Sequence, residues 1–591
     1  QARAQNTAQE NSHRCGGGEP ADLRLAVMAT KDGGNDPDDK PSQKTPFCSA
    51  FGSKLLLTIF CTHHLLKGFV GGGGASGLVG HAMEFTFRDM GVEGPMLQVY
   101  QAVAGLPWSM KALMGLVSDG FPIMGLRKAP YLMLATIGAI FAYAFIVTTA
   151  HPKLQAITGS FFMVFFQMAL ADLLVEAKYS EKVKVVPERG PDLITFVWGG
   201  ISIATIVSTV VAGALLEHKG PRACFAVALP FVVLMLWPTC CNYLEEVPDR
   251  ANPRLCSPDV EVWKGKGLVP FILALISGTA AVGMLVFSLL VDSVSANFAV
   301  ALFVGLLTLA LFSFFLRPVI AKINAFFFLQ SVFHIGTSGA QVYFFTDEAK
   351  QYPNGPHFTR QFYVTGIGVV AATCSLLGMF SYNIFAKTWK YRSILMASSI
   401  AYALSNGLSV IAYKRLNVEW GISDKLFMLA SSAMQSVLQQ LSWMPMTVML
   451  AQLVPHGIES VMYALLAGSL NLGTAVSNYA GALILNVLGV TPNGHTCCDE
   501  SEKFEHLWIA ATISALGPCV PLVLVNFLIP DARQTDRLLE DGDPGSATTG
   551  SLFEQCLIRW QRRRYGHLED ASGSEVEMST VVTPRAVGRR G

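Results

Sequence analysis

The sequence has few charged residues and almost no net charge. Asp, Glu, Lys and Arg make up 14% of its 591 residues, against roughly 25% in soluble globular domains, and the net charge is +1. This balance gives no indication of a nucleic-acid partner. Hydrophobic residues make up 51% of the chain, and the mean hydropathy is +0.42. The composition is therefore that of an integral membrane protein.

Motifs of enzymes and ATP-driven pumps are also missing. The sequence contains no GxSxG, no HExxH and no Walker A motif. Its twelve cysteines form no CxxC pair with the spacing of a zinc site. We therefore predict no enzymatic activity, no cofactor and no bound metal. A membrane receptor for a small solute stays open as an alternative class.

Apolar runs of about 20 residues, the length that crosses a bilayer, follow one another from residue 54 to residue 529. We predict fourteen membrane-spanning helices. They lie near 54–80, 97–119, 130–149, 155–177, 192–216, 223–244, 268–291, 296–316, 320–345, 363–386, 392–412, 425–454, 459–490 and 505–529.

The spans group as six, two and six, which predicts an all-α membrane protein of two six-helix halves. Both tails are polar, and the first is typical of a disordered segment. The expected parts are a tail (1–50), a first half (51–244), a cytoplasmic linker (245–267), two additional spans (268–316), a second half (317–530) and a second tail (531–591).

Loop charges set the expected orientation. With both termini inside, fifteen basic residues fall in inner loops and ten in outer loops. Positive charge favours the cytoplasmic side, so we predict cytoplasmic termini.

The two halves resemble a diverged repeat. Gly115-Leu-Val-Ser118, at the end of the second span, matches Gly378-Met-Phe-Ser381 at the end of the tenth. Paired six-helix halves with a substrate site between them are a transporter architecture.

A charged turn ends the second span. Asp119 closes the helix, and a Gly/Pro loop carrying Arg127 and Lys128 precedes the next one. A helix-terminal acid beside a short basic loop can hold one side of a bundle closed while the other opens. We therefore predict that these three residues gate the cytoplasmic side.

Two lysines lie inside predicted spans. Lys67 is fourteen residues past Ser53, or about 21 Å along a helix, and Lys111 is eight residues before Asp119, or about 12 Å. Inserting a basic side chain at mid-bilayer costs about 2.5–3.5 kcal/mol of free energy, so each lysine requires a structural or functional explanation. Snorkelling to the headgroups is open for both, and a structural ion pair is open for Lys111. We predict that both bind substrate.

Two acids follow in the fourth span. Asp172 and Glu176 are one turn apart on the same helix face and could share a proton, which would make them proton-coupling residues. The alternative is that they pair with Lys178, Lys182 or Arg127 and belong to the cytoplasmic latch, the contacts that hold the cytoplasmic side closed. Their expected place at the end of the span favours that alternative.

Uncharged polar stripes mark three further spans. Lipid cannot satisfy such faces, so they point inward, either to line a cavity or to join helices. Amides and hydroxyls near aromatic rings suit a flat heteroaromatic solute. The substrate-binding candidates on these stripes are His334, Gln341, Gln435, Gln439, Asn471 and Asn478.

Three separated motifs carry a family resemblance. Gly105–Tyr131, Phe85–Gly91 and Pro455–Gly473 occur in order and resemble the signatures of the folate–biopterin transporter family, a branch of the major facilitator superfamily. The resemblance covers about residues 53–530, and the two additional central spans are similar to those of kinetoplastid-type members. The chain departs from the pattern at Ala112, where the family has proline, and in the run Gly71–Gly74.

The resemblance implies a secondary transporter in the plasma membrane. Its substrate would be folate or an unconjugated pterin such as biopterin, moved with protons by alternating access. Some members carry S-adenosylmethionine, which is the alternative substrate. The expected partners are this small molecule and the lipid bilayer.

Overall fold

The computed structural model describes residues 46–72, 77–248, 268–453, 459–495, 498–536, 538–539 and 547–569. Throughout these ranges the regular structure is helical, apart from two isolated bridges, Ile123–Leu126 and Lys390–Arg533. The all-α prediction is confirmed for the described part of the chain. Most of the predicted tail 1–50 and linker 245–267, and parts of the tail 531–591, lie outside the described residues.

Nine helices in the described ranges are long and apolar enough to cross a bilayer, and each coincides with a predicted span. Several contain a short break. They are α6 (Ala129–Thr148), α7 (Leu154–Val185), α8 (Gly190–His218), α9 with α10 (Pro221–Leu234 and Leu236–Cys240), α12 (Leu268–Leu290), α13 (Val294–Phe315), the stretch around α16 (Ile367–Ser381), α17 (Tyr391–Tyr413) and the stretch containing α21 (Leu507–Leu516) and α22 (Val525–Leu528).

Three further predicted spans are segmented. The first contains α2 (Ser53–Ile59), a π-helical segment (Phe60–Val70) and α3 (Leu78–Asp89). The second contains α4 (Gly94–Gly105), a 3-10 turn (Leu106–Met110) and α5 (Lys111–Gly120). The ninth divides into α14 (Pro318–Val332) and α15 (Ser338–Thr346).

The other two predicted spans are the 29-residue helices α19 (Asp424–Gln452) and α20 (Glu459–Val487). Serine and amide side chains along them lower their hydropathy below that of a lipid-facing span. Breaks and polar faces at membrane depth are tolerated where the backbone is buried in protein or lines a cavity. These five segments therefore belong in the interior of the bundle.

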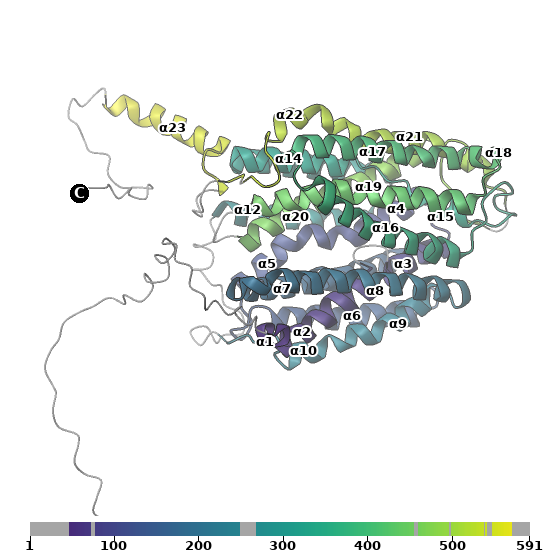
Figure 1. Cartoon of the computed structure of the whole chain (residues 1–591), viewed down its shortest axis with the longest axis horizontal. Helices are drawn as coiled ribbons and strands as arrows, with labels where there is room; N and C mark the ends of the chain where they lie inside the picture. Colours follow the sequence, from purple (N-terminus) through teal and green to yellow (C-terminus); the bar gives the residue numbers. More distant parts are fainter. Residues whose placement is uncertain are drawn as a thin grey trace, which may run out of the picture. The chain divides into compact units, whose positions relative to one another are not determined.

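Figure 1 shows the first-half helices α6 to α10 on one side of the bundle and the second-half helices α17, α21 and α22 on the other. Between them, α4 packs against α15 and α20, while α5 packs against α20. The additional helices α12 and α13 pack against α20, and α12 also contacts α5. The interior segments thus form the interface between the halves.

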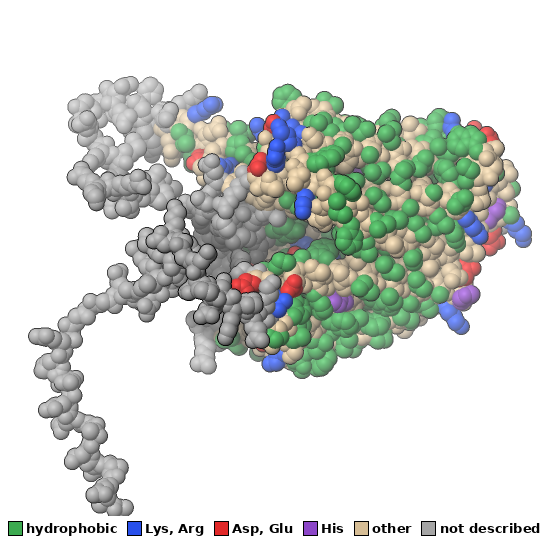
Figure 2. All heavy atoms as spheres, in the orientation of Figure 1, with side chains coloured by type: hydrophobic (Ala, Val, Ile, Leu, Met, Phe, Trp, Pro, Cys, Tyr) green, Lys and Arg blue, Asp and Glu red, His purple; other side chains and the backbone are tan. Residues whose placement is uncertain are grey.

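Apolar side chains cover the flank of the bundle in Figure 2, and charged side chains gather at its two ends. Such a distribution fits a lipid-facing flank with ends in water. Inside the first half, buried aromatic rings stack, with Phe161 and Phe225 centred 5.4 Å apart. The last helix, α23 (Leu552–Glu569), begins beside α13, where the Phe553 ring lies 5.1 Å from the Phe315 ring.

Candidate functional site

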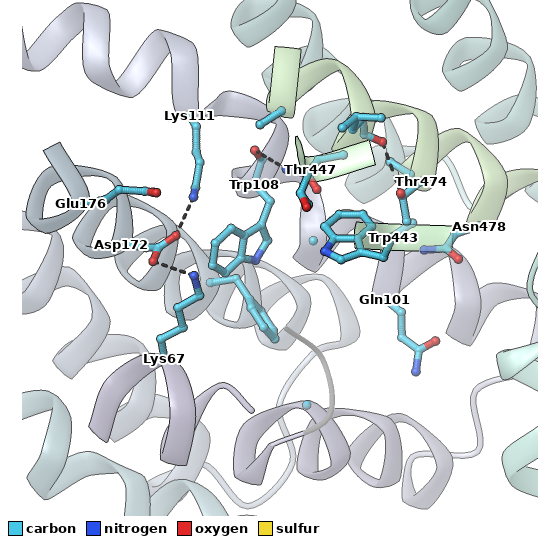
Figure 3. Close-up of a pocket in the computed structure, with 18 of the residues that line it drawn as sticks. Lys67, Gln101, Trp108, Lys111, Asp172, Glu176, Trp443, Thr447, Thr474 and Asn478 are labelled. Atoms are coloured by element: carbon cyan, nitrogen blue, oxygen red, sulfur yellow. Dashed lines mark hydrogen bonds and ion pairs between the residues drawn. The ribbon is translucent and has the colours of Figure 1, made fainter. Parts of the chain in front are cut away.

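A cavity of about 620 Å³ lies between the halves, within the size range of small-molecule sites. Its wall combines ionisable, aromatic and amide side chains, as Figure 3 shows. The interior segments supply much of this wall, together with α7 and α8.

An ion cluster occupies one end of the cavity. Asp172 of α7 is 2% exposed, and each of its carboxylate oxygens accepts a hydrogen bond from a lysine. Lys67 Nζ lies 2.7 Å from Oδ1, and Lys111 Nζ lies 2.6 Å from Oδ2. The His63 Nε2 atom is 3.3 Å from Oδ1. Burying a charge is costly unless it is paired, so these groups stabilise one another.

The cluster excludes three alternatives that the sequence left open. Neither Lys67 nor Lys111 snorkels to the headgroups, since both ammonium groups point into the cavity. Asp172 does not pair with the latch residues. Its predicted span ends at residue 177, but α7 continues to Val185, so Asp172 lies in the body of the helix.

Glu176 lines the same cavity, one turn further along α7. Its carboxylate lies 3.5 Å from the Tyr179 hydroxyl, which donates to it. Asp172 and Glu176 therefore face the cavity together, and their proton-coupling role stays a prediction.

Tryptophans surround the lysines. The Trp108 ring centre is 4.8 Å from Lys111 Nζ and 5.8 Å from Lys67 Nζ, and Trp198 is 5.0 Å from Lys67 Nζ. A cation held over an aromatic face is stabilised by the ring quadrupole. Sequence reasoning missed Trp108, although it lies within the Gly105–Tyr131 motif. Trp443 of α19 faces the same space from the second half.

Amides and hydroxyls line the other end of the cavity. Asn471 and Asn478 of α20 both line the cavity, and Figure 3 shows Asn478 and Thr474 on the side away from Asp172. The Asn471 amide donates to the backbone carbonyl of Trp108 at 3.1 Å. Ser338 donates to Gln101 at 3.2 Å, which links α15 to α4.

Four other predicted binding residues are not part of this cavity wall, and their role in substrate binding stays a prediction. The break between α14 and α15 ends the helical stripe, so His334 instead bonds Tyr402 through Nε2 at 2.9 Å. The Gln435 amide donates to the Ser405 carbonyl on α17 at 3.3 Å, as polar contacts between helices do. Gln341 and Gln439 are likewise absent from the wall.

Two ionisable residues of α3 join the cavity wall without having been predicted. His81 Nδ1 lies 3.9 Å from Glu84 Oε2, and both side chains line the cavity. The predicted first span ends at residue 80, which leaves both residues in a loop. The apolar residues Leu78, Val79 and Ala82 on the same segment are the signal that the helix continues.

The charged turn binds α7 and the start of the linker. Lys128 Nζ lies 2.7 Å from Glu181 Oε1 on α7. The Glu246 carboxylate accepts hydrogen bonds from the backbone N–H groups of Lys128 and Ala129 at 2.9 and 2.8 Å. Ser118 Oγ donates to the Arg127 carbonyl at 2.8 Å. These contacts fix the turn against α7, and the gating role of Asp119, Arg127 and Lys128 stays a prediction.

Asp119→Asn is expected to lower the maximal transport rate several-fold while changing substrate affinity little. The residue lies in the last turn of α5, beside the charged turn and outside the cavity wall. Initial uptake rates over a range of substrate concentrations separate the two quantities, with Asp192→Asn on the exposed start of α8 as control. A large loss of affinity at an unchanged maximal rate would place Asp119 in the binding site instead.

The comparisons identify the family. The model of the BT1 family matches residues 72–548. "Probable folate-biopterin transporter 6" of Arabidopsis thaliana is 25% identical over 76% of this chain and 78% of its own length. "Folate-biopterin transporter" of Synechocystis sp. is 24% identical, with 82% and 88% covered.

Solved structures show the same fold. A POT family transporter in complex with 5-aminolevulinic acid has a TM-score of 0.57 at 12% identity, covering 80% of this chain and 96% of that one. The POT family transporter PepTSo has a TM-score of 0.56 at 11% identity, covering 80% and 98%. The chain belongs to the BT1 family of folate-biopterin transporters and is a multi-pass membrane transporter with a fold like that of the POT family transporters.

Proposed function

We propose that this transporter moves folate or unconjugated pterins such as biopterin by alternating access, in symport with protons. The single observation that carries the proposal is the composition of the cavity, with two lysines at one end and amides at the other. The names of the relatives support the same solutes.

The two ends of the cavity suit the two parts of folate. A pterin ring is flat and carries donors and acceptors around its edge, which matches the tryptophan faces and the amides of Gln101, Asn471 and Asn478. The glutamate tail of folate carries two carboxylates, which match the ammonium groups of Lys67 and Lys111. Biopterin has the ring without this tail.

Charge balance favours proton coupling. Among the described residues of the wall, Lys67 and Lys111 face three carboxylates, Glu84, Asp172 and Glu176. An anionic substrate that enters this site adds negative charge beside these three carboxylates, of which Asp172 is paired with both lysines. Protonation of a carboxylate, with Asp172 and Glu176 as the candidates, relieves that repulsion. A proton and the substrate then cross together.

We further propose a topology of fourteen spans in the order six, two and six, with cytoplasmic termini in the plasma membrane. The nine long apolar helices supply its lipid-facing part, and two of them, α7 and α8, also line the cavity. The five polar or segmented ones supply its cavity, as the discontinuous helices of transporters do.

Uptake by cells that lack their own folate and pterin transporters tests the substrate. Labelled folate, biopterin and S-adenosylmethionine are supplied at external pH 5.5 and 7.5, with and without a protonophore. Saturable uptake of folate or biopterin that the protonophore abolishes is expected. Uptake of S-adenosylmethionine alone, or surface expression without uptake of any of the three, would overturn the proposal in favour of the other substrate or of a receptor.

A further inference from the structure

Two ion pairs join the halves at the end of the bundle opposite Asp119. Arg88, at the end of α3, donates from Nη2 to Asp347 Oδ1 at 2.8 Å. Arg360 donates from Nη1 and Nη2 to the two carboxylate oxygens of Asp89, at 3.0 and 2.6 Å. Each pair therefore combines one residue of the first half with one of the second.

The arginines also exchange aromatic contacts. The Arg88 guanidinium lies 5.7 Å from the ring centre of Tyr343, which is about one helical turn before Asp347. Arg360 lies 5.0 Å from the ring centre of Phe85, on the same helix as Asp89. In each half, an acidic side chain and an aromatic ring therefore contact the arginine of the other half. We call this set the charge clasp: Phe85, Arg88, Asp89, Tyr343, Asp347 and Arg360.

The clasp and the Asp119 turn lie at opposite ends. The chain leaves α3 at Asp89, enters α4 at Gly94 and reaches the end of α5 at Gly120, so the second span separates them. In Figure 1 the clasp end is the one where α15 lies with α18 (Leu416–Glu419). The four charged residues of the clasp line a polar cavity of about 670 Å³.

Asp347 is the buried member of the clasp. Its side chain is 0% exposed, and among the described residues no hydrogen-bond donor reaches its Oδ2 atom. An unpaired oxygen of a buried carboxylate costs free energy that a bound proton removes. The ionisable groups around it are Arg88 and Asp89 from α3, Glu217 from α8, the adjacent Glu348, His357 and Arg360 from the loop before α16, and His495 and Glu500 from the loop before α21.

We propose that the charge clasp is a gate and that Asp347 is its proton-binding site, so that closing this end of the bundle takes up a proton. This inference rests on the alternating access proposed above, because a gate presupposes two conformations. It adds a proton site outside the substrate cavity.

The effect of pH on the gate follows from the difference in the pKa of Asp347 between the closed and the open clasp. Burial raises the pKa of Asp347 to about 6 in the closed clasp, although the nearby Arg88 lowers it. Once the halves separate and water reaches the carboxylate, its pKa returns to about 3.9. The closed gate therefore binds the proton more tightly, and acid favours closure. Between pH 7.5 and pH 5 the ratio of closed to open gate rises about tenfold by this linkage.

Distances across the gate test the inference. Nitroxide labels at Met90→Cys and Lys350→Cys lie on opposite halves, in the full chain with its native cysteines replaced and reconstituted in lipid nanodiscs. Pulsed electron spin resonance without substrate then gives the ratio of short to long distances. A rise of about tenfold from pH 7.5 to pH 5 is expected, and Asp347→Asn is expected to reduce it to less than twofold.

Three control variants isolate the site. Glu348→Gln removes the charge of the exposed neighbour, and His357→Gln and His495→Gln remove the two imidazoles that line the same cavity. All three are expected to keep the response. A full response in Asp347→Asn, or a shift to long distances in acid, would overturn the inference.

A second variant keeps the test decisive if Asp347→Asn fails to fold. Asp89→Asn removes the bidentate pair with Arg360 and leaves Asp347 in place, so the gate is expected to open further at both pH values while still closing in acid. Unchanged distances or a lost response in Asp89→Asn would count against the clasp. Because no substrate is present, a chain that carries neither folate nor pterins but shows this response refutes the proposed substrate and not the gate.

Discussion

Asp172→Asn is expected to abolish uptake and to reduce the amount of folded protein in the membrane. The neutral amide cannot balance two ammonium groups that now lie 2.7 and 2.6 Å from the carboxylate oxygens. Removing one partner of a buried ion pair costs about 3–5 kcal/mol, because the remaining charge stays buried and unpaired. That cost is a large part of the roughly 5–15 kcal/mol that typically stabilises a folded protein.

The thermal midpoint of the purified protein and its surface level in cells measure this effect. Asp192→Asn is the matched control, since its partner Arg189 forms an exposed pair and exposed pairs contribute about 0–1 kcal/mol. The triple variant Lys67→Met, Lys111→Met, Asp172→Asn removes all three charges and is expected to recover folding without recovering folate uptake. An Asp172→Asn protein that folds and transports like the parent would contradict the role given to the cluster.

The sequence was sufficient to locate the helices but not the depth of Asp172. A run of apolar residues marks where a helix crosses lipid, so the long helices other than α7 were predicted within a few residues. The polar end of α7 offers no such mark, because water and lipid headgroups both tolerate it. The predicted span ends at residue 177, whereas α7 ends at Val185. The prediction therefore placed Asp172 near the cytoplasmic surface instead of in the cavity wall.

Contacts between helices could not be predicted from the sequence either. Lys67 has no acid in its own span, yet α7 supplies one from 105 residues away. Spacing within one helix shows which residues share a face, but not which helix that face meets. The predicted polar stripe through His334 is interrupted for a related reason, since α14 ends at Val332 and a second helix, α15, begins at Ser338.

Lys67→Met is expected to weaken folate uptake more than biopterin uptake. An ammonium group has three N–H donors, and among the described residues Lys67 gives one of them to Asp172. The remaining donors face the cavity, where a substrate carboxylate can accept them. A hydrogen bond to a charged group contributes about 1.5–3 kcal/mol, so its loss corresponds to roughly 10- to 150-fold weaker binding of folate.

The variant is expected to fold, because Lys111 remains bonded to Asp172 at 2.6 Å and keeps that carboxylate paired. Biopterin has no carboxylate, so its uptake is expected to fall less than threefold, a difference of about 0.7 kcal/mol or less. Paired uptake of the two solutes, normalised to surface protein, measures the ratio, with the exposed Lys425→Met as control. Equal losses for both solutes would make Lys67 a structural residue, and a preference for cationic S-adenosylmethionine would remove the basis for a carboxylate site at this end of the cavity.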